Sequence, residues 1–309
     1  MPAMKEFYFP SSDGKNQIYA RMWLPDGEVR GTVQLAHGIA EYINRYDDFA
    51  QFLASNGFVA AGNDHLGHGK SMGSPENQGF FADSNGWDLV IADMESLHKT
   101  LKRDYPDVPA ILLGHSMGSF LARTYLIRHP DDFDAAIISG TGHQSKLMVT
   151  AGLFLSKQEI KKHGPRYVSQ KLNNISMGGY NKGLGAAPGE TAWLSANHDN
   201  VVKYDADPLC GFTATCSVFR DMIGGMKFIT DPRNIDKMNK KVPVYFFSGA
   251  EDPVGEKGKG VERAYKAFLK AGMEDVFMRL YPGGRHEMLN ETNKAEVYQD
   301  VLNWINSKI

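Results

Sequence analysis

The 309-residue sequence has only two cysteines, Cys210 and Cys216, and no excess of charge of either sign. Two cysteines are too few for a disulfide framework, and they lack the repeated pairs of a structural zinc site, so we expect two buried free thiols. The 34 basic and 36 acidic side chains give a net charge of -2. Such a balance argues against nucleic acid as a partner.

Long hydrophobic runs are also missing. Residues 1–10 contain no apolar core of signal-peptide length, and no stretch approaches the ~18 consecutive apolar residues that a membrane-spanning helix needs. We therefore expect a cytoplasmic protein without a transmembrane segment. The hydrophobic content of 42% is ordinary for a globular protein, and the length fits one α/β domain with an insertion.

A serine in a glycine-flanked turn is the strongest chemical signal in the sequence. Gly114 to Gly118 read G-H-S-M-G, with a strand-like apolar run before the turn and a helical pattern after it, which is the context of a nucleophile elbow around Ser116. We interpret the glycines as removing β-carbons that would collide with the strained serine, and the small Ser119 as letting the helix approach the sheet. Main-chain N–H groups at the helix start would stabilise developing negative charge.

Strand and helix patterns alternate along most of the chain. An antiparallel pair is predicted at residues 7–10 and 17–24. Further strands are predicted at residues 32–36, 58–62, 111–113, 135–139, 242–247 and 276–281. Between residues 141 and 231 the alternation gives way to helical patterns and glycine-rich loops. The sequence thus predicts a mostly parallel sheet with helices on both faces, formed by residues 1–140 and 232–309, and a helical cap insertion of residues 141–231.

A serine nucleophile needs a base and an acid that orients the base. In the α/β-hydrolase fold the acid follows the nucleophile and the histidine comes last, each after a strand. Asp252 and His286 occupy these places, and His286 is the only histidine beyond Asp252. Glu251 is the competing acid; we favour Asp252 because the neighbouring Pro253 restrains the loop.

The oxyanion hole of such a fold is built from two main-chain N–H groups. One belongs to the residue after the nucleophile and the other to the loop after an early strand, which here predicts Met117 and Ile39. His37 is an alternative base, but it lies in a glycine turn, where we expect it to orient the loop.

The loop of residues 63–71 contains His65 and His68 and could be taken for a metal site. The two histidines lack a third well-spaced ligand, so we interpret the loop as a tight turn whose polar side chains satisfy its own backbone. We predict no metal and no cofactor.

Taken together, the motifs resemble those of the monoacylglycerol lipase and lysophospholipase branch of the α/β-hydrolases, in a bacterial form. The motifs that carry this resemblance are His37-Gly38 with Glu41 and Arg45-Tyr46, residues 64–71, the elbow, Asp252, His286-Glu287 with Asn290-Glu291, Trp193-Leu194-Ser195 and residues 207–212. The resemblance implies Ser116, Asp252 and His286 as a catalytic triad and Ile39 with Met117 as oxyanion donors.

The expected function is that of a serine hydrolase that cleaves esters of monoacylglycerol-like or lysophospholipid-like substrates through an acyl-enzyme. Three alternatives stay open: a small-ester carboxylesterase, a proline-type aminopeptidase, and a catalytically silent ligand-binding protein of the same fold. An aminopeptidase would need cap carboxylates for the substrate ammonium. Candidates without a clear pairing are Glu159, Glu190, Asp199, Asp205 and Asp207.

An apolar cluster lies within the predicted cap. Its members are Leu147, Met148, Val149, Leu153, Phe154 and Leu155. Ordinary packing is one explanation. For the group we predict that some members line an acyl tunnel above Ser116 and that others contact lipid aggregates or a membrane surface. The sequence leaves the oligomeric state open.

Overall fold

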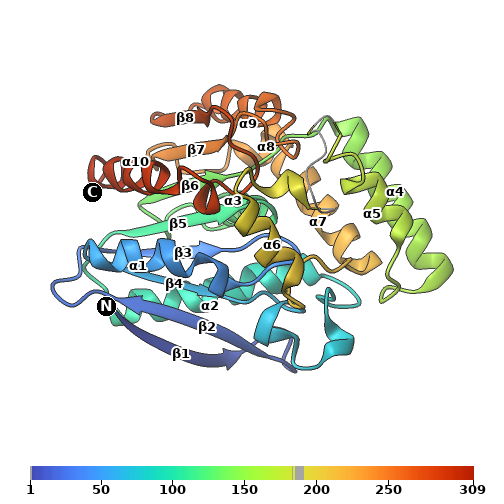
Figure 1. The fold of residues 1–309 in the computed structure, drawn as a ribbon, viewed down its shortest axis with the longest axis horizontal. Helices are drawn as coiled ribbons and strands as arrows, with labels where there is room; N and C mark the ends of the chain where they lie inside the picture. Colours follow the sequence, from blue (N-terminus) through green and yellow to red (C-terminus); the bar gives the residue numbers. More distant parts are fainter. Residues whose placement is uncertain (1, 183, 185–190) are drawn as a thin grey trace.

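The computed structural model describes residues 2–182, 184 and 191–309, which contain one eight-stranded sheet (Figure 1). The strand order is β1-β2-β4-β3-β5-β6-β7-β8. The strands are β1 (Ala3–Pro10), β2 (Gln17–Leu24), β3 (Gly31–Ala36), β4 (Phe58–Asn63), β5 (Ala110–His115), β6 (Ala135–Ser139), β7 (Val244–Gly249) and β8 (Val276–Tyr281). Strand β2 runs antiparallel to β1 and β4, and the remaining pairs are parallel, so the predicted α/β fold is confirmed.

The central strands are apolar because both faces of the sheet are covered. Every residue of β3, β4, β5, β6 and β7 is buried, which explains their continuous hydrophobic runs. The opening antiparallel pair is confirmed, from Ala3 opposite Leu24 to Pro10 opposite Gln17. Strand β7 begins two residues later than predicted, since Pro243 has no N–H for the ladder.

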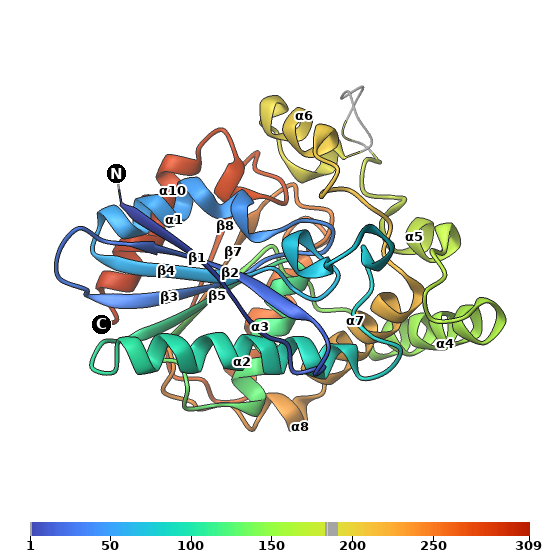
Figure 2. The ribbon, with the colours of Figure 1, turned by 90° about the horizontal axis from the view of Figure 1, so that it is seen from below.

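Helices pack on both faces of the sheet (Figure 2). One face is covered by α1 (Asp47–Ser55) and α10 (Lys294–Asn306). The other face is covered by α2 (Gly86–Asp104), α3 (Met117–Arg128) and α9 (Lys259–Lys270). Each helix contributes an apolar stripe to the core, such as Phe49 and Leu53 in α1.

The chain between β6 and β7 forms helices beyond one end of the sheet (Figure 1). These are α4 (Lys146–His163), α5 (Gln170–Met177), α6 (His198–Ala206), α7 (Cys216–Ile229) and α8 (Pro232–Ile235). Helix α7 packs against both α3 and α4 and thereby joins this segment to the core. These helices account for the helical patterns that the sequence shows between residues 141 and 231.

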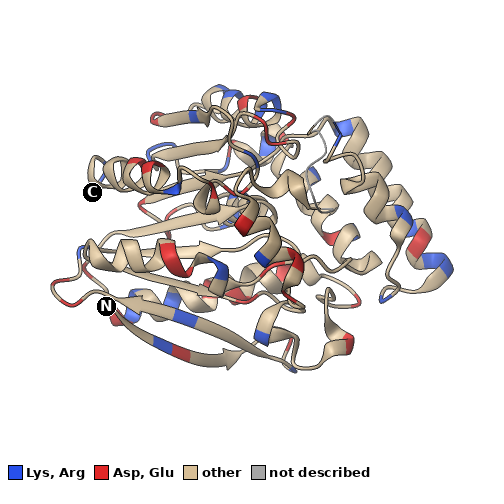
Figure 3. Ribbon diagram, viewed as in Figure 1, with Lys and Arg blue, Asp and Glu red and all other residues tan. Residues whose placement is uncertain are grey.

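Basic and acidic residues are interspersed along the ribbon in the view of Figure 3. Cys210 and Cys216 are buried free thiols, as predicted. Among the described residues, no helix combines the length and the apolar character needed to cross a membrane.

Candidate active site

Ser116 occupies the turn between β5 and α3 with φ 54° and ψ -120°. A positive φ is unfavourable for a residue with a side chain, so the backbone is strained here. Hydrogen bonds of the Ser116 main chain hold the turn. The N–H of Ser116 donates to the carbonyl of Ser139 at 3.0 Å, and the carbonyl of Ser116 accepts from Oγ of Ser119 at 2.5 Å.

Gly114 and Gly118 allow α3 to approach the sheet. A β-carbon at Gly118 would lie 2.0 Å from the carbonyl oxygen of Ala36 in β3, and one at Gly114 would lie 2.2 Å from the carbonyl oxygen of Gly118. From the sequence, the small Ser119 was expected to let the helix approach the sheet. The two glycines were expected to avoid a collision with Ser116. The structure differs: the glycines make room for the helix, and Ser119 uses its hydroxyl for hydrogen bonds.

Asp252 and His286 are in contact in the loops that follow β7 and β8. Nδ1 of His286 lies 3.0 Å from Oδ2 of Asp252, and both side chains are buried. Ser248 Oγ donates to the same oxygen at 2.8 Å, and the N–H of Val254 donates to Oδ1 at 2.9 Å. Burial favours a neutral carboxyl group, but His286 and these hydrogen bonds outweigh it and lower the pKa of Asp252. The carboxylate on Nδ1 leaves Nε2 of His286 available for chemistry.

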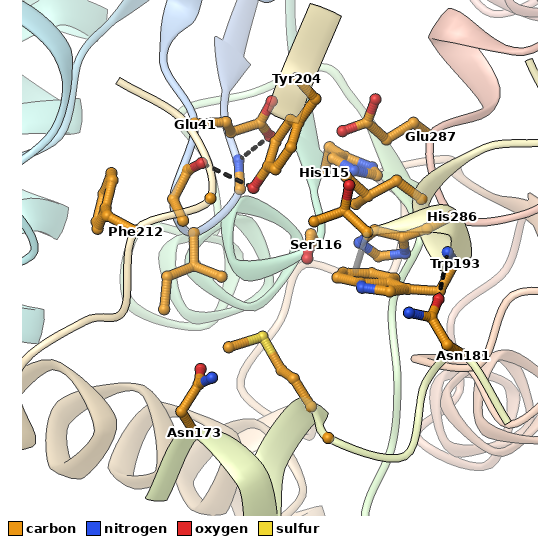
Figure 4. Close-up of a pocket in the computed structure, with 18 of the residues that line it drawn as sticks. Glu41, His115, Ser116, Asn173, Asn181, Trp193, Tyr204, Phe212, His286 and Glu287 are labelled. Atoms are coloured by element: carbon orange, nitrogen blue, oxygen red, sulfur yellow. Dashed lines mark hydrogen bonds between the residues drawn. The ribbon is translucent and has the colours of Figure 1, made fainter. Parts of the chain in front are cut away.

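The ring of His286 lines the same cavity as Ser116 (Figure 4). The rings of Trp193 and His115 lie against it, with centroid distances of 5.1 and 4.6 Å. Burial disfavours the imidazolium ion, but the charge of Asp252 outweighs this effect and raises the pKa of His286 above its usual value. His286 is therefore a stronger base than an ordinary histidine.

Glu251, the competing acid, lies at the surface. Its carboxylate forms an ion pair with Lys257 at 3.0 Å, and both side chains are about half exposed. The structure thus brings Asp252 to His286 and leaves Glu251 in solvent.

The loop after β3 lies against the turn at Ser116. A β-carbon at Gly38 would lie 3.1 Å from Cβ of Ser116, and Ile39, Ser116 and Met117 line one cavity. No hydrogen bond within the described part of the chain uses the main-chain N–H of Ile39 or of Met117. Two such N–H groups beside a nucleophile can stabilise an oxyanion.

His37 uses one ring nitrogen within its own loop and the other on the loop of residues 63–71. Nδ1 donates to the carbonyl of Gly38 at 2.8 Å, and Nε2 accepts from the N–H of His65 at 2.9 Å. Burial lowers the pKa of His37 well below its usual value. These contacts agree with the interpretation of His37 as a residue that orients the loop.

The other two histidines of this region also bond to nearby backbone. His65 Nε2 donates to the carbonyl of His37 at 3.2 Å, and His68 Nδ1 donates to that of Leu66 at 2.9 Å. Burial lowers the pKa of His65 to about 3 and that of His68 to about 4. Within the described ranges, no group of three or more metal-type ligands is found. The contact of His68 agrees with the turn interpretation, whereas His65 bonds to the backbone of the loop after β3.

Arg45 joins the loop after β3 to the loop after β8. Nη1 lies 2.9 Å from Oε2 of Glu41 and 2.5 Å from Oε1 of Glu287, and Nη2 lies 2.6 Å from Oε2 of Glu287. Oε1 of Glu41 accepts from the N–H of Gly38 at 2.6 Å. Burial alone would raise the pKa of Glu287, but Arg45 outweighs it and lowers this pKa to about 2. One guanidinium group therefore fixes the loop of Ile39 and the loop of His286 relative to each other.

Helix α6 lies over this ion-pair network. Asn200 Oδ1 accepts from Nη2 of Arg45 at 3.1 Å, and the centroid of the Tyr204 ring lies 4.7 Å from the guanidinium carbon of Arg45. The hydroxyl of Tyr204 donates to the carbonyl of Ala40 at 2.8 Å. Sequence reasoning gave no role to Asn200, Tyr204 or Trp193; the only signal was a family motif that includes Trp193.

Two cavities meet at Ser116. The first has a volume of about 350 Å³, and its polar lining residues include Glu41, Gln170, Asn173, Asn174, Thr191, Tyr204 and Glu287. The second has a volume of about 210 Å³, and its apolar lining residues include Phe120, Met148, Val149, Phe219, Met222, Ile223 and Met226. Ile39, Ser116, Met177 and Trp193 line both.

Some members of the apolar cluster of the predicted cap line the apolar cavity, and others lie against the core or in solvent. Met148 and Val149 line the apolar cavity. Leu155 packs against the core, whereas the side chains of Leu147 and Phe154 are 80% and 61% exposed. Leu153, the sixth member, is partly buried.

The fold and the site define a class of protein. A serine in a strained strand-to-helix turn, followed along the chain by an aspartate and a histidine in contact with each other, on a mostly parallel eight-stranded sheet, is the arrangement of an α/β-hydrolase. The protein family described as serine aminopeptidase S33 matches residues 27–293, and the chain belongs to this family.

Relatives in this superfamily are named as ester hydrolases. A monoacylglycerol lipase of Mycolicibacterium smegmatis is 27% identical over 98% of both chains. A monoglyceride lipase of Homo sapiens is 24% identical over 96% of this chain and 89% of the relative. The crystal structure of a thermostable carboxyl esterase from Bacillus coagulans with glycerol has a TM-score of 0.92 at 29% identity, and it covers 100% of this chain and 99% of that one. The chain is accordingly a serine ester hydrolase of the α/β-hydrolase superfamily.

Proposed function

We propose that Ser116, His286 and Asp252 hydrolyse a carboxylic ester through an acyl-enzyme. Nε2 of His286 takes the proton of Ser116 Oγ as this oxygen attacks the ester carbonyl carbon, and the N–H groups of Ile39 and Met117 stabilise the oxyanion. The bond to the alcohol oxygen then breaks, and His286 returns the proton to the leaving alcohol. Water repeats the same steps on the acyl-enzyme and releases the carboxylic acid.

The substrate that we propose is a monoacylglycerol-like ester. The observation that carries this proposal is the position of Ser116 at the junction of an apolar cavity and a more polar one, here called the polar cavity. An ester bond at Ser116 would place the acyl chain in the apolar cavity and the alcohol among carboxamide and hydroxyl groups. The Mycolicibacterium relative, 98% of which the match covers, is named a monoacylglycerol lipase, and this name supports the same substrate class.

The charges of the polar cavity favour a neutral alcohol. Its described lining residues include no lysine or arginine that could bind the phosphate of a lysophospholipid. Its carboxylates, Glu41 and Glu287, are both paired with Arg45. A substrate ammonium would therefore find no free carboxylate among these lining residues, which is unfavourable for an aminopeptidase.

The cap carboxylates considered for an aminopeptidase lie elsewhere. Glu159 forms an ion pair with Lys171, and Asp207 accepts a hydrogen bond from Tyr42. Neither these two nor Asp199 and Asp205 line the two cavities at Ser116. Glu190 lies outside the described residues.

We further propose that residues 141–231 act as a cap on a core of residues 1–140 and 232–309, and that this cap contacts lipid aggregates. The exposed side chains of Leu147, Met148 and Ile175 support this proposal, because Met148 and Ile175 also line the apolar cavity. An acyl chain could then pass from a lipid surface into the cavity without crossing water.

We also propose a cytoplasmic location. Cys210 and Cys216 are both free thiols, a state that a reducing compartment maintains. Fractionation of the source cells tests this location.

Substitution of the nucleophile tests the chemistry. Ser116→Ala should lower kcat by about 10⁴ to 10⁶ and leave the fold intact, because only the nucleophile is lost. Full activity in this variant would refute the proposal.

A panel of a monoacylglycerol, a lysophosphatidylcholine and an aminoacyl anilide tests which leaving group the enzyme accepts. We expect hydrolysis to be fastest for the monoacylglycerol.

Variants of two adjacent residues of α4 distinguish the role of the acyl cavity from that of the contact with lipid. Met148→Asp should slow hydrolysis of long-chain esters and spare acetate esters, since Met148 lines the cavity. Leu147→Asp is the matched control: Leu147 is exposed and lies outside the cavity lining, so this variant should lose activity only on vesicles or emulsions.

In the wild type, the catalytic efficiency kcat/KM should rise several-fold per two added carbons of the acyl chain, at about 0.8 kcal/mol per buried methylene. A steady decline from acetate upward would overturn the lipid proposal.

A further inference from the structure

Arg123 in α3 is a fully buried cation. Nη1 donates to the carbonyl of Gly142 at 2.9 Å and to Oγ1 of Thr141 at 3.3 Å, and Nη2 donates to the carbonyl of Ile229 at 3.4 Å and lies 3.3 Å from Nδ1 of His143. Its partners in the described part of the chain include no carboxylate. Burial lowers the pKa of Arg123 to about 9, so the group is still charged at neutral pH. A buried charge without a counterion costs stability, and such exceptions concentrate at functional sites.

Two hydroxyl groups connect this cation to the nucleophile. Oγ1 of Thr141 lies 2.9 Å from Oγ of Ser119, which lies 2.5 Å from the carbonyl oxygen of Ser116. Oγ of Ser119 is the donor in both contacts, and Oγ1 of Thr141 also accepts from Nη1 of Arg123. The side chains of Ser119, Thr141 and Arg123 are all fully buried.

This chain of hydrogen bonds ends on the peptide unit that contains the N–H of Met117. The carbonyl of Ser116 and the N–H of Met117 belong to one planar group. The same carbonyl also accepts from the N–H groups of Ser119 at 2.9 Å and Phe120 at 3.3 Å. Donors on the carbonyl fix the tilt of the plane and polarise the N–H on its opposite side.

We propose that Arg123, Thr141 and Ser119 form a hydrogen-bond relay that positions the N–H of Met117 for the developing oxyanion. The three are positioning residues, because they act through the peptide group. The inference rests on the proposed function, in which this N–H is an oxyanion donor. Since the oxyanion forms only on the way to the tetrahedral intermediate, the relay should act on kcat and leave KM unchanged.

Removal of the hydroxyl groups tests the relay. Ser119→Ala and Thr141→Val should each lower kcat by about tenfold, part of the ~10²–10³ that a whole oxyanion donor contributes. The affinity for a boronic acid, whose tetrahedral adduct places an oxygen in the hole, should fall by a similar factor. The acid limb of the pH profile, which His286 sets, should not move. Thr141→Ser keeps the hydroxyl and should restore kcat.

A buried threonine on the same helix provides the matched control. Thr124 accepts from Nε1 of Trp87 at 3.2 Å and donates to the carbonyl of Phe120 at 2.9 Å, outside the relay. Thr124→Val should therefore keep the wild-type kcat. In a Ser119→Ala background, Thr141→Val should have no further effect on kcat, because Thr141 acts through Ser119.

Three results would overturn the relay: a kcat within twofold of wild type in folded Ser119→Ala and Thr141→Val proteins, an equal loss in Thr124→Val, or fully additive losses in the double variant. Circular dichroism establishes that each variant is folded. The proposed function is tested separately by Ser116→Ala. If wild-type activity depends on Ser116 and the relay variants stay fully active, only the relay is refuted.

Discussion

Replacement of Arg45 by methionine would leave two buried carboxylates without their counterion. The side chains of Glu41 and Glu287 are each 4% exposed, and that of Arg45 is 10% exposed. Removal of one partner from a buried ion pair costs about 3–5 kcal/mol, because the remaining charge stays buried. A large domain loses roughly 2–4 °C in Tm per kcal/mol. We therefore expect Arg45→Met to lower Tm by about 6–20 °C at pH 8.

The pH dependence of this loss follows from the carboxyl groups. Arg45 outweighs the effect of burial and holds the pKa of Glu287 at about 2, below its ordinary 4.5, so its contribution to wild-type stability is complete above pH 4.5 and is lost only as the pH falls toward 2. In Arg45→Met, the strongest effect that opposes burial is lost, so the pKa of Glu287 rises, and the pKa of Glu41, which burial already raises in the wild type, rises further. Protonation then relieves the buried charge, so the difference in Tm between the two proteins should narrow from pH 8 to pH 5.

Differential scanning calorimetry across this pH range measures both effects. Lys266→Met is the matched control, because Lys266 pairs with Glu262 at 2.8 Å on the exposed face of α9. An exposed pair of this kind contributes less than about 1 kcal/mol, so its Tm should change little. A loss below about 3 °C in Arg45→Met, or a difference that widens toward acid pH, would refute the reasoning.

Three further outcomes are expected. Asp252→Asn should lower kcat by about 10⁴, as loss of the orienting carboxylate does in other triads, whereas Glu251→Gln should stay within twofold; comparable losses would reverse the assignment of the acid. Because Asp252 raises the pKa of His286 against the effect of burial, kcat/KM should fall with acidification at a higher pH than for an ordinary histidine, and in Asp252→Asn the residual activity should titrate at lower pH; an unmoved midpoint would contradict this. Gly118→Ala should destabilise the protein by about 1–3 kcal/mol in urea unfolding, since its β-carbon would lie 2.0 Å from the carbonyl oxygen of Ala36.

The features that sequence reasoning could predict have local patterns. The apolar runs of the central strands follow from burial on both faces. The elbow at Ser116 combines a short motif with the strand and helix on either side of it. The expectation that Asp252 and His286 come together needed only chain order, because the ends of parallel strands meet at one edge of the sheet.

The remaining features depend on contacts between distant segments. Arg45 and Glu287 are 242 positions apart, and neither has a periodic pattern that points to the other. Trp193 reaches His286 only because the chain between β6 and β7 folds back over the sheet. Ser119 was interpreted as a small packing residue, since nothing in its neighbourhood identifies Thr141 as a hydroxyl partner. Side-chain networks of this kind follow from tertiary packing, which hydrophobic periodicity does not encode.

The junction of the two cavities at Ser116 also governs how the acyl-enzyme is divided between competing nucleophiles. With the acyl group in the apolar cavity, as proposed, the first product would leave through the polar cavity and the incoming water would enter by it. A small neutral alcohol present at high concentration would travel along this route as well and attack the same carbonyl carbon. On this proposal, transesterification would accompany hydrolysis. The ratio of new ester to free acid would report which molecules the polar cavity admits, independently of how fast the serine is acylated.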